Sequence, residues 1–152
     1  MIAELSALPW ERVGEIVFCG FGEPTMRLDV LLKILRWLRA EHPNIKTRLN
    51  TNGLSDLFLG RDTAPDFDGL LDTISISLNA SNAERYLELT RSRFGLRSFE
   101  AMLTFAEHAK TYVPDVVLTV VDHVEDDGEI AKCRAICEER SLRLRVRAYE
   151  AS

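Results

Sequence analysis

The residues with the clearest chemical potential follow the apolar run IVFC, where the sequence reads GFGEPT. Gly20 and Gly22 lie one residue apart, and Glu23 and Pro24 follow at once. Glycines at the carboxyl end of a strand let the backbone approach a ligand closely, and ligands of parallel α/β folds lie beyond those strand ends. The segment therefore predicts either a binding site or an ordinary tight turn. It lacks the third glycine of a dinucleotide fingerprint and the Gly-Lys-Ser/Thr of a phosphate loop, so neither NAD nor ATP is supported.

Short apolar runs alternate with amphipathic segments along the whole chain. The predicted strands are residues 16–19, 46–51, 73–79, 116–121 and 142–149. The predicted helices begin after Leu28 and near Asn82, Phe99 and Glu129. Asp29 is the predicted N-cap of the first helix, and Ser81 with Glu84 three residues later has the spacing of a capping box. The fold class is therefore α/β, because repeated βα units imply a parallel sheet with right-handed crossovers.

Three of the predicted strands alternate between polar and apolar side chains, although parallel strands are usually apolar on both faces. Their polar positions are Arg48, Asn50 and Asn52, then Thr73, Ser75, Ser77 and Asn79, and finally Arg143, Arg145 and Arg147. Helices would cover the apolar faces, so the polar faces together predict the lumen of a barrel or half-barrel that holds a polar ligand. A charged edge strand is the other explanation for the three arginines.

Length, charge and composition exclude several classes of protein. A chain of 152 residues that is 46% hydrophobic predicts one domain over residues 1–152. Its formal charge of −5 gives no reason to expect binding to nucleic acid or to an anionic membrane. No apolar run approaches the roughly 20 residues of a membrane span, and the first residues lack the basic start of a signal peptide, so we expect a cytoplasmic protein. The three cysteines do not resemble a disulfide framework, and we expect free thiols.

An ordered set of motifs gives the sequence a family resemblance. The strings VFCGFGEPTMRLDVLL, RLNTNG and LDTISISLNA follow one another, and VPDVVLTVVD and RVRAYE come later. Together they resemble the radical SAM superfamily, and more narrowly the radical SAM proteins named for their association with TatD-type nucleases. The resemblance implies a partial TIM-type (β/α) barrel with sequential strand order, and S-adenosylmethionine as the cofactor.

The resemblance also implies a set of cofactor-binding residues. They are Gly20, Gly22, Glu23, Pro24, Asn50, Asn52, Ser77 and Asn79. The glycine turn and the Glu23 carboxylate would receive the ammonium group of S-adenosylmethionine, since charge-assisted hydrogen bonds are the stronger class. Ser77 and Asn79 would reach the ribose hydroxyls. For Asn52 with Gly53, a turn that needs positive φ is the competing explanation.

One feature of the superfamily is missing from these motifs. Radical SAM catalysis needs a [4Fe-4S] cluster, usually held by a C-x3-C-x2-C segment after the first strand. This chain has Cys19 in a strand-like run and Cys133 and Cys137 on one face of a predicted helix, where we expect packing and no metal ligation. The first 14 residues are too few for the missing strand, loop and helix. We therefore expect a truncated core without its first βα unit, inactive by itself, and the status of the chain as an enzyme is open.

Two other classes of function stay open. The first is a non-catalytic α/β module that keeps only the scaffold and binds a partner or a second copy at the sheet edge left by the missing strand. The second is an open doubly wound sheet that binds an unrelated nucleotide, which a non-sequential strand order would favour. The sequence does not indicate a substrate, because radical SAM enzymes share the core and differ in what they act on.

Overall fold

The computed structural model describes residues 6–19, 23–122 and 127–148. Its strands are β1 (Glu15–Phe18), β2 (Lys46–Thr51), β3 (Thr73–Ser77), β4 (Asp115–Asp122) and β5 (Arg143–Ala148). Its α-helices are α2 (Leu28–Glu41), α3 (Ser55–Leu59), α4 (Ala83–Thr90), α5 (Arg97–Ala109) and α6 (Asp127–Glu139). Short 3-10 turns form at η1 (Trp10–Arg12), η2 (Pro24–Arg27) and η3 (Ala64–Phe67). None of the helices in these ranges is long and apolar enough to cross a membrane.

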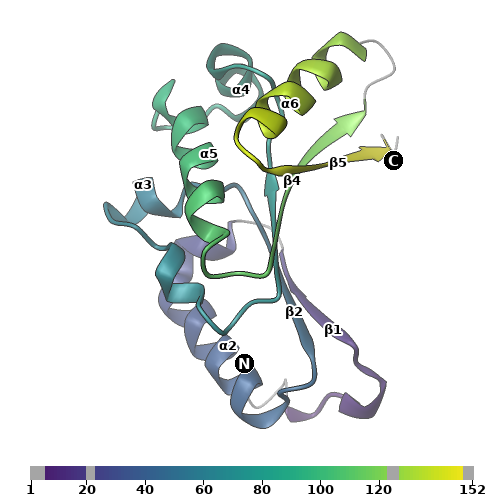
Figure 1. Ribbon diagram of the computed structural model, residues 1–152. Coiled ribbons are helices and arrows are strands. Elements are labelled where there is room, and N and C mark those ends of the chain that lie inside the picture. Colours follow the sequence, from purple (N-terminus) through teal and green to yellow (C-terminus); the bar gives the residue numbers. More distant parts are fainter. Residues whose placement is uncertain (1–5, 20–22, 123–126, 149–152) are drawn as a thin grey trace.

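The five strands form one parallel sheet in the order β1-β2-β3-β4-β5. Strand order therefore equals chain order, as in part of a TIM-type barrel, and this confirms the α/β prediction. A doubly wound sheet would reverse its order at a switch point, so that alternative is wrong. Figure 1 shows the strong twist of the sheet, with β5 running across the direction of β1 and β2.

The two faces of the sheet differ because the strands alternate as the sequence predicted. Residues in register on parallel strands share a face. One shared face is apolar, and its fully buried members include Leu49, Ile74, Ile76 and Leu118. The helices pack on this face, and α2 and α5 lie along it in Figure 1. The opposite face carries Arg48, Asn50, Ser75, Ser77 and Arg145 and holds no helix among the described residues.

Two predicted helix caps are wrong. The chain enters α2 through the 3-10 turn η2, so Asp29 lies inside the helix, and the capping side chain is Glu23 in front of η2. At α4 the N-cap is Asn82, whose side chain accepts a hydrogen bond from Arg85 N at 2.8 Å. The backbone N–H of Ser81 donates instead to Glu129 Oε1 on α6, at 2.6 Å.

Candidate functional site

Glu23 ties the segment after β1 to the end of β2. Its Oε2 accepts hydrogen bonds from Thr25 N at 2.9 Å, Thr25 Oγ1 at 2.5 Å and Thr51 Oγ1 at 2.7 Å. Its Oε1 accepts one from Asn52 N at 2.6 Å. Pro24 begins η2 directly after it, where a missing N–H costs nothing. One carboxylate therefore fixes two neighbouring strand ends against each other.

The acceptor capacity of this carboxylate is unequally used. An ionised carboxylate offers about two lone-pair sites per oxygen, so Oε2 is saturated by its three donors. Oε1 has one donor among the described residues and keeps room for a second. Gly20 and Gly22, the other predicted parts of this turn, lie outside the described residues.

The Asn52–Gly53 turn follows β2 directly. Gly53 has φ +76°, and Asn52 Oδ1 accepts a hydrogen bond from Leu54 N at 3.0 Å. The backbone geometry is thus that of an Asn-Gly turn, as the competing explanation required. Asn52 nevertheless contributes to the Glu23 arrangement, because its backbone N–H is one of the four donors.

A pocket of about 160 Å³ opens on the helix-free face of the sheet. We call it the lumen pocket, and it is lined by Arg48, Asn50, Ser75, Ser77, Thr119, Arg145 and Arg147. It brings together Asn50 and Ser77 from the predicted set, whereas Glu23, Asn52 and Asn79 do not line it. Asn79 lies just beyond β3 with φ +65°. Asn50 Oδ1 is buried without a hydrogen-bond partner in the described part of the chain, so the pocket contains an unused acceptor.

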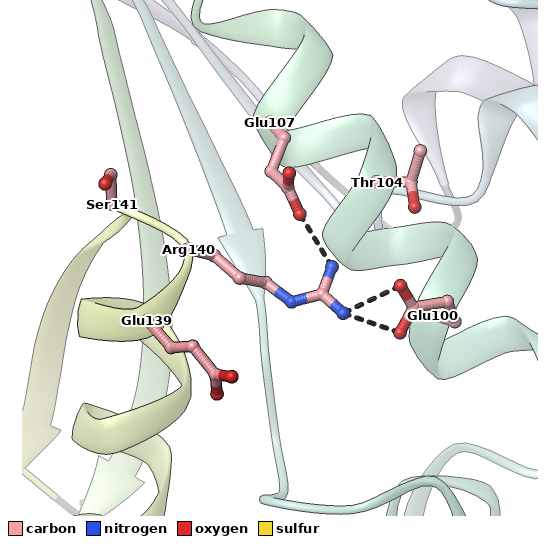
Figure 2. Close-up of a pocket in the computed structure, with 6 residues that line it drawn as sticks. All are labelled: Glu100, Thr104, Glu107, Glu139, Arg140 and Ser141. Atoms are coloured by element: carbon pink, nitrogen blue, oxygen red, sulfur yellow. Dashed lines mark hydrogen bonds and ion pairs between the residues drawn. The ribbon is translucent and has the colours of Figure 1, made fainter.

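A larger hollow of about 560 Å³ lies between α5 and α6, on the helix side of the sheet. Figure 2 shows Arg140 reaching from the end of α6 to two glutamates of α5, with distances of 2.7 Å to Glu100 and 2.6 Å to Glu107. The hydrogen bond to Glu100 raises the pKa of Arg140. The arginine in this hollow is thus matched by carboxylates of the chain, which gives a helix-to-helix tie and leaves no positive charge for an anionic ligand.

Comparison with known families decides the relationship. The chain matches the family model described as "Radical SAM superfamily" over residues 1–135. The chain belongs to the radical SAM superfamily. A comparison with curated proteins gives no match. The radical SAM family and the partial barrel with sequential strands are therefore confirmed.

The iron–sulfur cluster typical of radical SAM enzymes does not fit the cysteines of this chain. Cys19 is exposed and directly follows β1, at one edge of the described sheet. Cys133 and Cys137 are buried on α6, which packs against β4 and β5 at the other edge. Both belong to the hydrophobic core, which confirms their predicted packing role. The three thiols therefore do not converge on one site, and none of them forms a disulfide, as predicted.

The three thiols are expected to differ strongly in reactivity. Burial raises the pKa of Cys137 to about 11, and Cys133 is fully buried. Titration with a disulfide reagent at pH 8 should therefore modify Cys19 quickly and the other two at least about 100-fold more slowly, at the rate of local opening. Denaturant should make all three react, and Cys19→Ser should remove only the fast phase. Two or more fast thiols in the native protein would contradict this arrangement.

Sequence reasoning missed Tyr86, a residue of α4 that lies in the hydrophobic core. Its side chain is 1% exposed, and its hydroxyl has no hydrogen-bond partner in the described part of the chain. Burial, with a smaller contribution from Glu23, raises the pKa of Tyr86 to about 12. The tyrosine packs on Phe99 of α5. Its place on the apolar face of the predicted helix was therefore the only sign in the sequence that it would be buried.

Tyr86→Phe is expected to leave stability at pH 7 unchanged or raise it by about 1–2 kcal/mol, because it removes a buried hydroxyl without a partner. At high pH the unfolded phenol loses its proton first, so the wild type should lose up to about 3 kcal/mol between pH 10 and pH 12. Urea unfolding in this pH range should show a flatter decline for Tyr86→Phe. Tyr112→Phe is the control and should keep the wild-type slope. A slope equal to wild type in Tyr86→Phe would contradict the assignment.

Asp56, Asp62 and His108 also come together, with one ligand atom of each within 4.8 Å of the others. The side chains of Asp62 and His108 are both 50% exposed. Asp56 Oδ1 already accepts hydrogen bonds from Thr63 N at 2.8 Å and Thr63 Oγ1 at 2.6 Å. These contacts explain the cluster as a loop-ordering feature, and we assign no metal to it.

Proposed function

We propose that this chain is the S-adenosylmethionine-binding core of a radical SAM enzyme, similar to the TatD-associated members of the superfamily. The observation that carries the proposal is the Glu23 arrangement at the carboxyl ends of β1 and β2. Parallel α/β folds bind their ligands at this end of the sheet. A polar pocket that contains Ser77, the last residue of β3, opens on the adjoining face and supports the same position.

Within this proposal the residues share the work as follows. Gly20, Gly22 and Pro24 are the proposed source of backbone carbonyls for the methionyl ammonium group. The remaining capacity of Glu23 Oε1 is the proposed acceptor for the same charge. Ser77 and Asn79 receive the ribose hydroxyls. Asn50, near the end of β2, and Asn52, just after it, are the adjacent candidates.

The radical chemistry of the superfamily depends on a cluster that binds S-adenosylmethionine through an open iron. Because Cys19 lies apart from Cys133 and Cys137, we propose that the chain binds the cofactor but does not cleave it unaided. Anaerobic reconstitution followed by iron and sulfide analysis checks this point. Close to four irons per chain would contradict it.

Equilibrium dialysis with labelled S-adenosylmethionine tests the binding proposal. The wild type should show saturable binding with Kd below about 1 mM. Ser77→Ala should weaken it about tenfold, because the proposed hydrogen bond to the ribose is lost. The fold should stay intact, since the Ser77 hydroxyl makes no hydrogen bond within the described residues. Thr111→Ala is the control, because Thr111 is exposed, does not line the lumen pocket and has no side-chain hydrogen bond within the described residues. Failure of the wild type to bind would overturn the proposal.

The free edge of β1 favours a second candidate, a non-catalytic interaction module. β1 pairs only with β2 in the described sheet, and its Val17 is 41% exposed. Exposed strand edges recruit other strands, either from a partner or from a second copy of the chain. Concentration-dependent association in sedimentation velocity, together with no affinity for S-adenosylmethionine, would support this candidate over the first.

A further inference from the structure

We propose that the lumen pocket binds the anionic end of the substrate through Arg48, Arg145 and Arg147. This inference rests on the proposed function, because it treats the ligand of the pocket as the molecule that lies beside S-adenosylmethionine. The ligand chemistry is a carboxylate or a phosphate group, and the rest of the lining consists of hydroxyl and amide groups from Asn50, Ser75, Ser77 and Thr119.

The charge of the pocket is the first observation. Three of its seven lining residues are arginines and none is a carboxylate, although the chain as a whole carries a formal charge of −5. A cation-rich concavity in an acidic protein concentrates anions locally. The lining thus differs from the surface average in the direction that an anionic ligand requires.

The pairing of the arginines is the second observation. Arg39, Arg61, Arg85, Arg140 and Arg143 each lie within 3.2 Å of a carboxylate oxygen. Arg145 and Arg147 form no ion pair within the described ranges. Arg48 lies 3.8 Å from Glu15 and donates one hydrogen bond, to Ser75 Oγ at 3.3 Å, while its buried Nε has no hydrogen-bond partner there. Arg145 and Arg147 are therefore available to a ligand. Arginines elsewhere, such as Arg27, Arg36 and Arg91, also form no ion pair within the described ranges, but the pocket is distinguished by gathering three guanidinium groups in one concavity.

The sheet register explains how these groups meet. Ser77 of β3 is in register with Thr119 of β4, and Thr119 is in register with Arg145 of β5, so the three form a row across the sheet. Arg147 lies two residues beyond Arg145 and so faces the same side. Arg143 shares the strand and the face but pairs with Asp115 and does not line the pocket.

Geometry and size favour the end group of a small molecule. A guanidinium is a planar fork that binds carboxylate or phosphate oxygens in pairs. A volume of about 160 Å³ is below the usual range for a whole ligand and suits one end of it. Charge defence of the edge strand β5 would explain arginines spread along it, but it does not explain why Arg48 of β2 points into the same pocket.

Isothermal titration of the full chain at constant ionic strength tests the inference, with inorganic phosphate and succinate as probes. At least one probe should bind saturably, and the stronger of the two identifies a phosphate ester or a carboxylic acid as the substrate class. Arg145→Gln/Arg147→Gln should weaken that binding by about tenfold or more, because both forks are lost. Arg143→Gln is the matched control and should stay within about twofold of wild type.

Several outcomes would overturn the inference. The first is that neither phosphate nor succinate binds to the wild type. The second is that the double variant and Arg143→Gln bind the probes equally well. A third is a double variant that loses affinity for S-adenosylmethionine and not for the probes, since the arginines would then serve the cofactor. Probe binding that depends on Arg145 and Arg147 in a chain with no affinity for S-adenosylmethionine would support the anion site while refuting the proposed function.

Discussion

Glu23→Ala is expected to lower the free energy of unfolding by about 2–4 kcal/mol, which is large for one partly exposed side chain. The carboxylate accepts from two backbone N–H groups and two hydroxyls, and alanine leaves all four without this partner. Thr25 and Thr51 are buried, so water cannot fully replace the lost acceptor. Urea denaturation monitored by circular dichroism measures the loss.

A graded variant separates charge from geometry at Glu23. Glu23→Gln keeps the shape and one oxygen, so it should cost about half as much as Glu23→Ala. Glu84→Ala removes an exposed glutamate in the first turn of α4 and should stay within about 0.5 kcal/mol of wild type. A Glu23→Ala protein as stable as Glu84→Ala would show that the four hydrogen bonds contribute nothing net.

The same variants bear on cofactor binding. If Glu23 acts mainly by holding the turn after β1, affinity for S-adenosylmethionine should fall in proportion to the loss of stability across the series. If its Oε1 also receives the ammonium group, Glu23→Gln should lose affinity out of proportion to its small cost in stability, because the charge is gone while the turn persists. The ratio of the two effects therefore distinguishes a positioning residue from a direct contact.

Sequence alone predicted the features that depend on a short repeat. Alternation with period two along β2, β3 and β5 fixes which side chains share a face, and the shared polar face did become the lumen pocket. The helical spacing of Cys133 and Cys137 similarly predicted their burial. Such features follow from local geometry, which the order of residues specifies directly.

Features that depend on distant partners were not predictable. Nothing local distinguishes Arg143 from Arg147, and only the register of β4 with β5 brings Asp115 to the first of them. Ser81 has the spacing of a cap, but Glu129 takes its N–H and Asn82 becomes the N-cap. Two of the four donors to Glu23 belong to Thr51 and Asn52 at the end of the next strand, 28 and 29 residues away, so its role as a tie needed the folded structure.

Gly53→Ala is expected to be the most damaging single-methyl change at this end of the sheet, at about 2–5 kcal/mol. Its φ of +76° disfavours any L side chain, and a Cβ there would lie 2.9 Å from Ile76 Cγ2 and 3.1 Å from Met102 Cγ. Ile76 and Met102 are both fully buried, so neither moves away without disturbing the core. Thermal and urea unfolding measure the loss.

Gly60→Ala is the matched control because it isolates the backbone part of this cost. Gly60 also has positive φ, +65°, but a Cβ there would meet nothing within 4 Å. Its substitution should cost only about 1–2 kcal/mol, from the left-handed backbone alone. The difference between the two variants is then the steric part, and equal losses would show that the core around Gly53 yields easily.

The position of Gly53 makes this steric part matter for the site. The turn is pressed between β3 and α5, and its preceding residue donates the backbone N–H that Glu23 Oε1 accepts at 2.6 Å. A methyl group that pushes the turn away from Ile76 also moves that N–H, so Gly53→Ala should weaken S-adenosylmethionine binding at temperatures where the protein is still folded. Gly60→Ala should leave binding unchanged. A folded Gly53→Ala protein with wild-type affinity would mean that the core and the Glu23 arrangement are mechanically independent.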